Sequence, residues 1–465
     1  MSKITTTDTI CALSTPPGMG AIAVIRLSGP DSFEVISRVF RPADKSLDIR
    51  TAQSHTIHFG ILGTESSILD EVLVSLFRAP HSYTGEDVIE ISCHGSVFIQ
   101  KTTLELLLSQ GLRLAKPGEF TLRAFMNRKF DLSQAEAVAD LIASHSDTSH
   151  DLAINQMRGG FSKKISALRQ SLVEFTALIE LELDFSEEHM IFADRNDLTS
   201  LLDKIEFELS LLVKSFSLGN VIKNGIPVAI IGKPNVGKST LLNAILNEEK
   251  AIVSEIPGTT RDAIEDTIVI GGYSFRFIDT AGLRAAEDKI ESIGIERTWE
   301  KISEAAIILY VFDAPEQSFA DVMESLSDFK EISPDKKLHL ILIGNKMDKL
   351  KTLPKGFKDF VEHETIFVSG KRKENIHLIA EHLQKIVDTA NISDKTIVSN
   401  SRHYEALQKA LESIQSVRSG LNTGISPDLL TIDIRSALYH LGEITGEVTT
   451  DEILGTIFSR FCIGK

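Results

Sequence analysis

The chain has 465 residues, of which 42% are hydrophobic and 25% charged, a composition typical of folded globular proteins. Its length exceeds that of one ordinary domain and indicates about three domains. The formal net charge of −16 argues against a surface that binds nucleic acid over its whole extent, so any RNA contact is expected to be local or supplied by a partner.

The pattern of apolar residues and cysteines predicts a cytoplasmic protein. No run approaches the ~18 consecutive apolar residues that a membrane-spanning helix needs. The N-terminus, MSKITTTDTI, lacks the charged and apolar regions of a signal peptide. Cys11, Cys93 and Cys462 are an odd number of cysteines without metal-ligand spacing, which is typical of a reducing compartment.

The first part of the chain mixes the apolar periodicity of strands with that of helices. Residues 21–27, 72–77 and 88–92 have the apolar patterns of strands, and residues 102–108 have that of a helix. We therefore predict an N-terminal α+β domain over residues 1–119.

From residue 120 the apolar pattern becomes helical. The tetrapeptide Ser133-Gln134-Ala135-Glu136 has the form of a capping box and is predicted to open a helix. Long amphipathic stretches continue to about residue 218, so residues 120–218 are predicted to form the first part of a helical domain.

A phosphate-binding loop follows. Residues 232–239 read G-K-P-N-V-G-K-S, which matches G-x-x-x-x-G-K-[ST], with an apolar strand pattern before it at 227–231 and a helical pattern after it at 240–246. In such a loop the backbone N–H groups and the helix N-terminus attract a polyphosphate, Lys238 neutralises the terminal phosphates, and Ser239 ligates Mg²⁺. The chain is therefore predicted to bind a nucleoside triphosphate.

Downstream strands end in the motifs of a GTPase. The strand predicted over 275–278 leads into the D-x-x-G of residues 279–282, which holds the Mg²⁺ shell and senses the γ-phosphate. The buried strand predicted over 338–344 leads into Asn345-Lys346-Met347-Asp348. A carboxylate at Asp348 accepts hydrogen bonds from N1–H and the 2-amino group of guanine, and adenine offers neither donor.

The strand predicted over 365–368 delivers Ser369-Gly370-Lys371, where a backbone N–H is expected to contact guanine O6. These motifs, in this order, predict a P-loop GTPase domain with a doubly wound sheet over residues 219–388. The predicted GTP-binding residues are Asn235, Val236, Gly237, Lys238, Ser239, Thr240, Ser254, Glu255, Ile256, Pro257, Gly258, Thr259, Thr260, Asp279, Thr280, Ala281, Gly282, Asn345, Lys346, Asp348, Ser369 and Gly370.

The residue after D-x-x-G is Leu283, which cannot orient the attacking water as the glutamine of Ras-like GTPases does. Two groups are candidates for replacing the missing glutamine. Glu291 is a carboxylate where the second switch is expected, although it also fits a solvated acid at the start of a helix. Asn235, together with the long first switch of residues 254–262, has the oxygens to hold a monovalent cation against the phosphates. Thr260 is the expected switch threonine on Mg²⁺.

Residues 402–419 and 427–445 are again helical in pattern, and the tail from 449 to 465 mixes apolar and polar residues. We therefore predict that residues 389–465 complete the helical domain and that the GTPase domain is inserted into it.

Several longer motifs give the chain a family resemblance. They are D-T-I-x-A and T-P-P-G-x-G-A-I-A-V-I-R-L-S-G near the N-terminus, S-Y-T-G-E-D-V-I-E, P-G-E-F-T-L-R-A-F-M-N-R-K-F-D-L-S-Q-A-E-A, the G-T-T-R-D of the first switch, and the terminal C-I-G-K. Together, and in this order, they resemble the MnmE family of tRNA wobble-uridine modification GTPases over the whole chain.

That resemblance implies an activity, cofactors and partners. The family works with a flavoprotein, MnmG, which carries FAD, to add an aminomethyl or carboxymethylaminomethyl group to C5 of uridine 34 in certain tRNAs. The carbon comes from a 5-formyl- or 5,10-methylene-tetrahydrofolate. By resemblance, Arg26 and Lys129 face the folate, Glu90 bonds the pterin edge, and Lys465 completes the pocket. Without the resemblance, Arg26 and Glu90 read as ordinary exposed residues of strands.

The resemblance also implies potassium in the cation cage, held by Asn235, Ser254, Ile256 and Thr259. Ser239 and Thr260 would hold Mg²⁺, and Glu291 would orient the attacking water through a bridging water. Family members are homodimers through the N-terminal domain, and their GTPase domains meet when GTP and potassium bind.

The cysteines divide into two kinds. Cys462 lies beside glycine and lysine near the C-terminus, where a neighbouring ammonium favours the thiolate, and the resemblance makes it a candidate participant in modification. A buried structural cysteine is the alternative. Cys93, next to His94, reads as structural.

Three functions remain open at this point. The first is a tRNA-modifying GTPase. The second is a regulatory GTPase that binds ribosomal particles, and the third is a folate-binding protein whose GTPase gates access of the ligand. The C-I-G-K tail and the residues assigned to folate favour the first.

Overall fold

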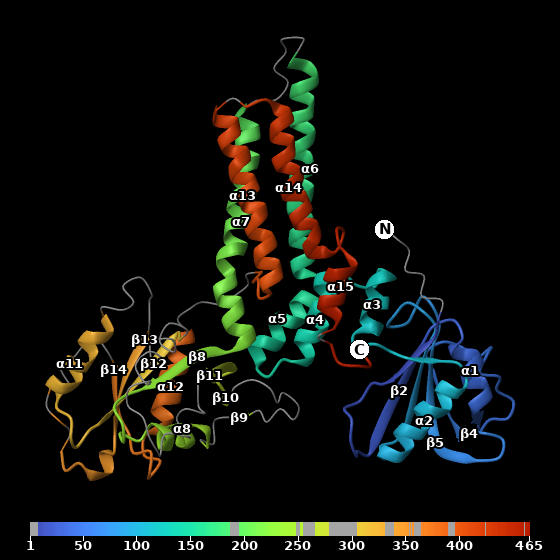
Figure 1. Cartoon of the computed structure of the whole chain (residues 1–465), viewed down its shortest axis with the longest axis horizontal. Helices are drawn as coiled ribbons and strands as arrows, with labels where there is room; N and C mark the ends of the chain where they lie inside the picture. Colours follow the sequence, from blue (N-terminus) through green and yellow to red (C-terminus); the bar gives the residue numbers. More distant parts are fainter. Residues whose placement is uncertain are drawn as a thin grey trace. The chain divides into compact units, whose positions relative to one another are not determined.

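The computed structural model describes most of the chain and divides it into two compact units (Figure 1). The first unit comprises residues 1–139, 156–202 and 412–465, and the second comprises residues 140–155 and 203–411. The residues that the structure describes are 8–186, 195–247, 252–253, 266–278, 305–330, 339–352, 354, 356–357, 364–388, 396–423, 425–459 and 461–465.

The first unit begins with a seven-stranded sheet in the order β3-β4-β5-β6-β2-β1-β7. Neighbouring strands are antiparallel except β1 and β7, which are parallel. The strands are β1 (Ile10–Leu13), β2 (Ile22–Ser28), β3 (Phe40–Pro42), β4 (Thr56–Gly63), β5 (Ile68–Phe77), β6 (Val88–His94) and β7 (Arg113–Leu114).

Alternation along these strands separates two faces of the sheet. One face joins α1 (Ser32–Val39) and α2 (Val97–Ser109) in an apolar core that includes Ile25, Ile36 and Leu107. The other face carries more exposed side chains, among them Ile57 and Phe59 of β4 and Leu73 of β5. The α+β class predicted for this region is confirmed, and β2, β5, β6 and α2 cover the predicted strands and helix.

The helices of the first unit follow this sheet. They include α3 (Glu119–Met126), α4 (Leu132–Ile142), α6 (Gly160–Ser186), α14 (Pro427–Thr445) and α15 (Asp451–Phe458), with α14 packed along α6 (Figure 1). The helix α15 forms part of the tail, for which the sequence predicted no element.

The capping box predicted at residues 133–136 is wrong: the cap lies two residues earlier, at residues 131–134. The helix α4 begins at Leu132, and the reciprocal cap is made by Asp131 and Gln134. Asp131 Oδ1 accepts from Gln134 N at 2.9 Å, and Gln134 Oε1 accepts from Asp131 N at 3.0 Å. Ser133 lies inside the helix, where its hydroxyl is 3.1 Å from that of Ser162. Aspartate is as good an N-cap as serine, so the tertiary contact of Ser133 decided between them.

The second unit contains most of α7 (Arg195–Asn224), most of α5 (Asp147–Met157) and the first half of α13 (Ser401–Thr423). It also contains a sheet in the order β14-β13-β12-β8-β11-β10-β9, which is parallel from β14 to β11. Its strands are β8 (Ile226–Ile231), β9 (Ile252–Val253), β10 (Asp266–Ile270), β11 (Tyr273–Phe277), β12 (Ile307–Asp313), β13 (His339–Asn345) and β14 (Glu364–Phe367).

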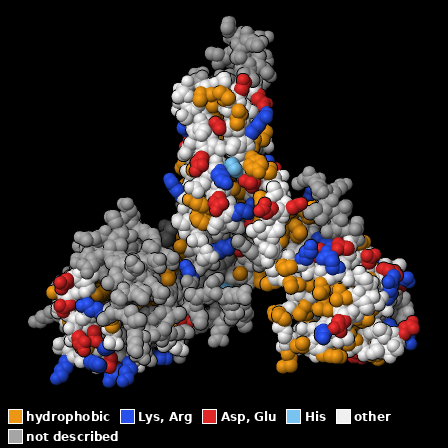
Figure 2. Space-filling model, viewed as in Figure 1, with side chains coloured by type: hydrophobic (Ala, Val, Ile, Leu, Met, Phe, Trp, Pro, Cys, Tyr) orange, Lys and Arg blue, Asp and Glu red, His pale blue; other side chains and the backbone are white. Residues whose placement is uncertain are grey.

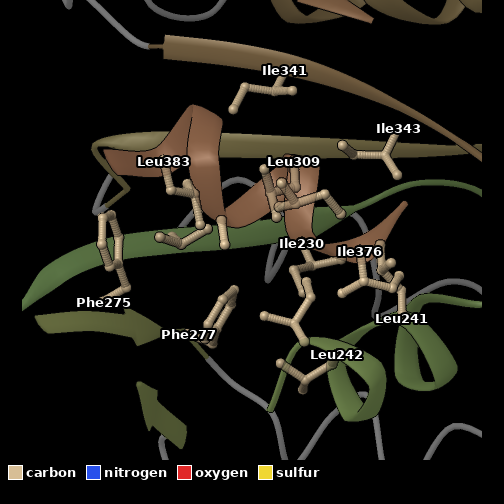
Figure 3. Packing of buried hydrophobic residues seen from close by; sticks show 14 of the residues in the cluster. Ile230, Leu241, Leu242, Phe275, Phe277, Leu309, Ile341, Ile343, Ile376 and Leu383 are labelled. Carbon is tan, nitrogen blue, oxygen red and sulfur yellow. The ribbon is translucent and has the colours of Figure 1, made fainter. Parts of the chain in front are cut away.

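Helices cover both faces of this sheet, as its nearly continuous apolar strands require. Leu309 of β12 packs with Leu241 of α8 (Lys238–Leu246) and Leu383 of α12 (Ile376–Asp388) on one face (Figure 3). On the other face Phe312 packs with residues of α11 (Phe319–Lys330). The predicted fold class, a doubly wound P-loop domain inserted into a helical domain, is confirmed. Within the described ranges, no helix has the length and apolarity needed to cross a membrane.

Candidate functional site: a nucleotide site and a tail-closed cluster

The phosphate loop joins the end of β8 to the start of α8. Gly237 has φ +93° and is the N-cap of α8, and a Cβ there would collide with the Asn345 side chain. Lys238 Nζ donates to the carbonyls of Gly232 and Lys233, each at 2.9 Å. The ammonium is therefore held across the loop at a helix N-terminus, the arrangement that binds the phosphates of a nucleotide.

Asn345, at the end of β13, ties this loop to two further segments. Its Nδ2 donates to Val236 O at 2.9 Å. Its Oδ1 accepts from Lys346 N at 2.8 Å and from Gly370 N at 3.0 Å. The Gly370 N–H belongs to the segment of residues 369–371 in which a backbone N–H is predicted to contact guanine O6, and it donates to Asn345 in this structure.

Lys346 makes a second brace, which joins the phosphate loop to the end of β12. It has φ +64°, and its Nζ donates to Asn235 O at 2.9 Å and to Asp313 Oδ2 at 2.6 Å. Asp313 is buried at the end of β12, and its Oδ1 has no hydrogen-bond partner among the residues that the structure describes. The sequence analysis missed Asp313, although an aspartate that closes an otherwise apolar strand is a recognisable signal.

Asp348 is ready to accept hydrogen bonds. The Ser369 hydroxyl donates to Asp348 Oδ1 at 2.7 Å, and this bond is the largest influence holding the pKa of the carboxyl below its usual value. Arg372 Nε is 3.9 Å from Oδ2. Of the predicted nucleotide residues, the structure brings together those of the phosphate loop, the Asn345–Asp348 segment and Ser369–Gly370.

Other predicted residues lie outside the described residues. They are the first-switch residues Ser254, Glu255, Ile256, Pro257, Gly258, Thr259 and Thr260, the D-x-x-G residues Asp279, Thr280, Ala281 and Gly282, and Glu291.

A second cluster forms on the N-terminal sheet. Arg26 of β2 pairs with Glu90 of β6, with Nε–Oε1 at 2.9 Å and NH2–Oε1 at 2.8 Å. The guanidinium lies over two rings, 5.1 Å from the centroid of Tyr83 and 5.7 Å from that of Phe120. The Tyr83 and Thr121 hydroxyls are 2.8 Å apart. Arg26 is thus held by a carboxylate and two aromatic faces.

The end of the chain joins this cluster. Gly464 O accepts from Arg26 NH1 at 3.5 Å and from the Ser14 hydroxyl at 3.3 Å. Burial lowers the pKa of the Lys465 ammonium, and the nearby Arg26 lowers it further, while Glu90 acts in the opposite direction. The structure thus brings together Arg26, Glu90 and Lys465, three of the four residues that the resemblance assigns to folate.

Lys129, the fourth, lies beside the loop that carries Tyr83. Its Nζ donates to Pro80 O at 3.1 Å, and its side chain runs past Gly85.

The cysteines differ in exposure and acidity. Cys11 and Cys93 are buried, and burial raises the pKa of each thiol to about 11. Cys462 is exposed. His94 lies on the opposite face of β6 from Cys93 and pairs with Asp70, with Nδ1–Oδ1 at 2.7 Å. Cys93 and His94 therefore form no dyad, in line with the structural reading of Cys93.

The parallel sheet, the phosphate loop and the Asn345–Asp348 segment define a P-loop GTPase domain, here inserted into a helical domain that follows an α+β domain. Residues 132–462 match the family model described as the MnmE helical domain, and residues 9–129 match that of the GTP-binding protein TrmE N-terminus. The chain belongs to the MnmE family.

Curated relatives extend this similarity over the full length. A tRNA modification GTPase MnmE of Flavobacterium psychrophilum is 53% identical over 98% of this chain and 99% of its own length. That of Cytophaga hutchinsonii is 51% identical over 99% of this chain and 98% of its own. That of Parabacteroides distasonis is 52% identical over 98% of this chain and 100% of its own.

Proposed function

We propose that this chain is a GTP-hydrolysing enzyme of tRNA modification. With a flavoprotein partner of the MnmG kind, which carries FAD, it adds an aminomethyl or carboxymethylaminomethyl group to C5 of wobble uridine 34. The carbon donor is a one-carbon tetrahydrofolate, either 5-formyl or 5,10-methylene. The proposal places the reaction in the cytoplasm.

The observation that carries this proposal is similarity over the whole chain to relatives named tRNA modification GTPase MnmE. Each of the three parts of the molecule is included in that similarity, which supports a function in which the terminal domains and the GTPase domain act together. The net charge of −16 favours a partner that supplies much of the contact with tRNA.

The chemistry of the second cluster suits a reduced folate. The Glu90 carboxylate is an acceptor for the donor-rich amino-pyrimidinone edge of a pterin, and Arg26 and Lys465 are cations near it. Tyr83 and Phe120 supply flat apolar surface beside Arg26. A folate bound there would supply the one-carbon unit, and these residues would bind and orient it. Lys129, which lies between α3 and α4 and bonds to the loop that carries Tyr83, is proposed to reach the ligand from beside that loop.

A homodimer through the N-terminal domain is supported by the exposed face of the sheet. Ile57, Phe59 and Leu73 on this face are 66%, 51% and 46% exposed, and Figure 2 shows hydrophobic side chains gathered on this domain. Exposed apolar patches of this kind mark interfaces. Phe59 pairs with Leu73, and the adjoining Ser75 pairs with Glu90, so a partner on this face would flank the Arg26–Glu90 pair.

The cation proposals rest on residue chemistry. Ser239 and Thr260 are proposed to hold Mg²⁺, and Asn235, Ser254, Ile256 and Thr259 to hold potassium where GTPase domains of two copies meet. Glu291 is proposed to orient the attacking water. Hydrolysis measured in potassium and in sodium at equal ionic strength tests the cage. Potassium is expected to accelerate hydrolysis, and equal rates would remove the cage from the proposal.

The experiment that tests the modification role is mass spectrometry of tRNA nucleosides from cells that lack this protein. Complementation with the wild type is expected to restore the modified wobble uridine, and complementation with Cys462→Ser tests whether the exposed thiol participates. Full restoration by Cys462→Ser would make the thiol dispensable and remove it from the chemistry.

Unchanged nucleosides in the deleted strain would overturn the modification role itself. GTP-dependent co-sedimentation with ribosomal particles would then favour a regulatory GTPase. Folate-dependent GTP hydrolysis without RNA would favour a folate-binding protein gated by its GTPase domain.

A further inference from the structure

The last residues of the chain are held against the N-terminal domain through backbone groups. Cys462 O accepts from Gly118 N at 3.4 Å and from Lys465 N at 3.3 Å. Gly464 O accepts from Ser14 and Arg26. Because carbonyl groups make these contacts, they fix the path of the main chain at residues 462–465 whatever the side chains are.

Gly118 meets this path at a point where only hydrogen fits. It is the N-cap of α3 with φ +68°, a left-handed conformation that disfavours residues with a Cβ. A Cβ at this position would lie 2.6 Å from Phe458 O and 3.0 Å from Phe461 Cβ. Phe458 and Phe461 are buried, with ring centroids 5.2 Å apart, so neither can move aside freely.

Gly464 makes a second close approach from the side of the tail. It has φ +96°, and a Cβ there would collide with the carbonyl of Leu13, with Ser14 Cα at 3.0 Å. The strand β1 ends at Leu13, and its partner β2 carries Arg26. The tail is thus seated against the same pair of strands that presents Arg26 and Glu90.

The geometry points to Gly118 as a positioning residue: by admitting the tail beside α3, it and Gly464 form a two-point latch that holds Cys462 and Lys465 next to the Arg26–Glu90 pair. Gly118 touches no reacting group and acts through the tail. This inference deepens the proposed function, because the latch assembles the cluster that we propose binds folate.

The test measures the mobility of the tail, residues 461–465, independently of folate binding. Cys462 is the exposed cysteine, and the other two thiols are buried with raised pKa values, so a nitroxide reagent labels Cys462 in the full-length protein. Gly118→Ala is expected to increase the mobility of the label and to speed hydrogen exchange at residues 461–465 by about tenfold. The matched control is Gly111→Ala, because Gly111 has φ +96° but nothing within 4 Å of a Cβ. The control also places an alanine at a positive φ, but without a steric clash, and is expected to leave the tail in place.

A label that stays as immobile in Gly118→Ala as in the wild type would overturn the latch, as would equal release by Gly111→Ala. If Gly118→Ala fails to fold, Gly464→Ala replaces it, since a change next to the last residue leaves the core intact. Tetrahydrofolate affinity of the unlabelled variants is measured in parallel and is expected to fall about tenfold with the tail released. Release of the tail with unchanged folate affinity would uphold the latch and count against the proposed folate site.

Discussion

Asn345 and Lys346, adjacent residues at the end of β13, connect the phosphate loop to two different parts of the GTPase domain. Asn345 connects Val236 of the phosphate loop with Gly370, and Lys346 connects Asn235 of the same loop with the buried Asp313. The phosphate loop and the segments that we propose read the base are therefore braced against each other by the protein's own hydrogen bonds. Such preorganisation reduces the ordering cost of binding.

Asp348→Asn is expected to weaken GTP binding on the order of 100-fold, because the carboxylate that accepts from guanine is replaced by an amide that also donates. Xanthine carries a carbonyl where guanine carries its 2-amino group, so affinity for xanthosine triphosphate is expected to rise. Titration with fluorescent analogues of both nucleotides measures the exchange of preference. Loss of affinity for both would mean that the substitution had damaged the fold.

The Ser369 hydroxyl lowers the pKa of Asp348 from its ordinary value of 3.8, so the carboxylate persists to lower pH than usual. Its contribution is complete above that ordinary value and is lost as pH falls through the lowered one. Asp348 is therefore expected to remain ionised at about pH 5, so its titration should not reduce GTP affinity at that pH. In Ser369→Ala the pKa of Asp348 should rise, and the loss of GTP affinity in acid should begin at a higher pH than in the wild type.

Asp313→Asn is expected to weaken GDP binding about tenfold, because Lys346 loses the charged partner that sets its position. Since Asp313 acts through Lys346, the double variant with Lys346→Met should be less impaired than the sum of the single variants, with a coupling of about 1 kcal/mol. Calorimetric affinities of the four proteins measure this coupling. Asp321→Asn, at an exposed aspartate bonded to Ser318, is the control. Additive losses would assign Asp313 an independent structural role.

At the scale of elements, the sequence predicted most accurately what is encoded locally. The strand and helix on either side of the phosphate loop follow from apolar runs and a motif of fixed spacing, and β8 and α8 lie where they were predicted. The tail helix α15 was missed because its apolar face is completed by distant residues, among them Leu132. The contact at Gly118 is likewise long-range. Asp313 itself is marked locally, as an aspartate that closes an apolar strand, but its partner Lys346 is distant in sequence and no local pattern encodes that pairing.

The cap of α4 provides an element-scale prediction. Asp131→Ala removes the side-chain oxygen that accepts from Gln134 N and is expected to reduce the free energy of unfolding by about 1 kcal/mol. Chemical denaturation measures the loss. Asp131→Ser preserves a cap and should recover most of it. Equal stability of the alanine variant and the wild type would contradict the assignment of the cap to Asp131.

The hairpin of β10 and β11 provides a second prediction at the scale of elements. In sequence it connects the first-switch motif to the D-x-x-G motif, and its turn is bonded to α5, since the Thr148 hydroxyl and N–H donate to Gly272 O at 3.0 and 3.3 Å. Thr148→Val keeps the shape and the N–H but removes the hydroxyl, and is expected to destabilise the turn by about 1 kcal/mol. Hydrogen exchange at residues 270–274 should accelerate accordingly. Thr423→Val, whose hydroxyl bonds within its own helix, should leave this exchange unchanged.

At the scale of the whole molecule, the fold explains why residues of one cluster are distributed over the whole length of the chain. Arg26, Glu90 and Lys465 are far apart in sequence, and the cluster forms only when the first unit has gathered both ends of the chain. The family resemblance grouped these residues, and the structure places them side by side, because the resemblance carries information about tertiary structure. Composition and periodicity contain none of that information, and from them alone Arg26 and Glu90 were ordinary strand residues.

The proposed dimer has a kinetic consequence. If the N-terminal sheets hold two copies together, the GTPase domains meet at an effective concentration set by the tether, of the order of millimolar, and specific activity does not change on dilution. Phe59→Glu places a charge on the exposed sheet face and is expected to produce monomers by sedimentation. Its GTP hydrolysis in potassium should then become second order in protein, with specific activity falling in proportion to dilution.

Phe207→Glu, at a phenylalanine of α7 that is 61% exposed, controls for the added charge and should behave like the wild type. A monomeric Phe59→Glu protein whose specific activity is independent of concentration would show that hydrolysis needs only one copy, and would separate the dimer of N-terminal domains from the catalytic step.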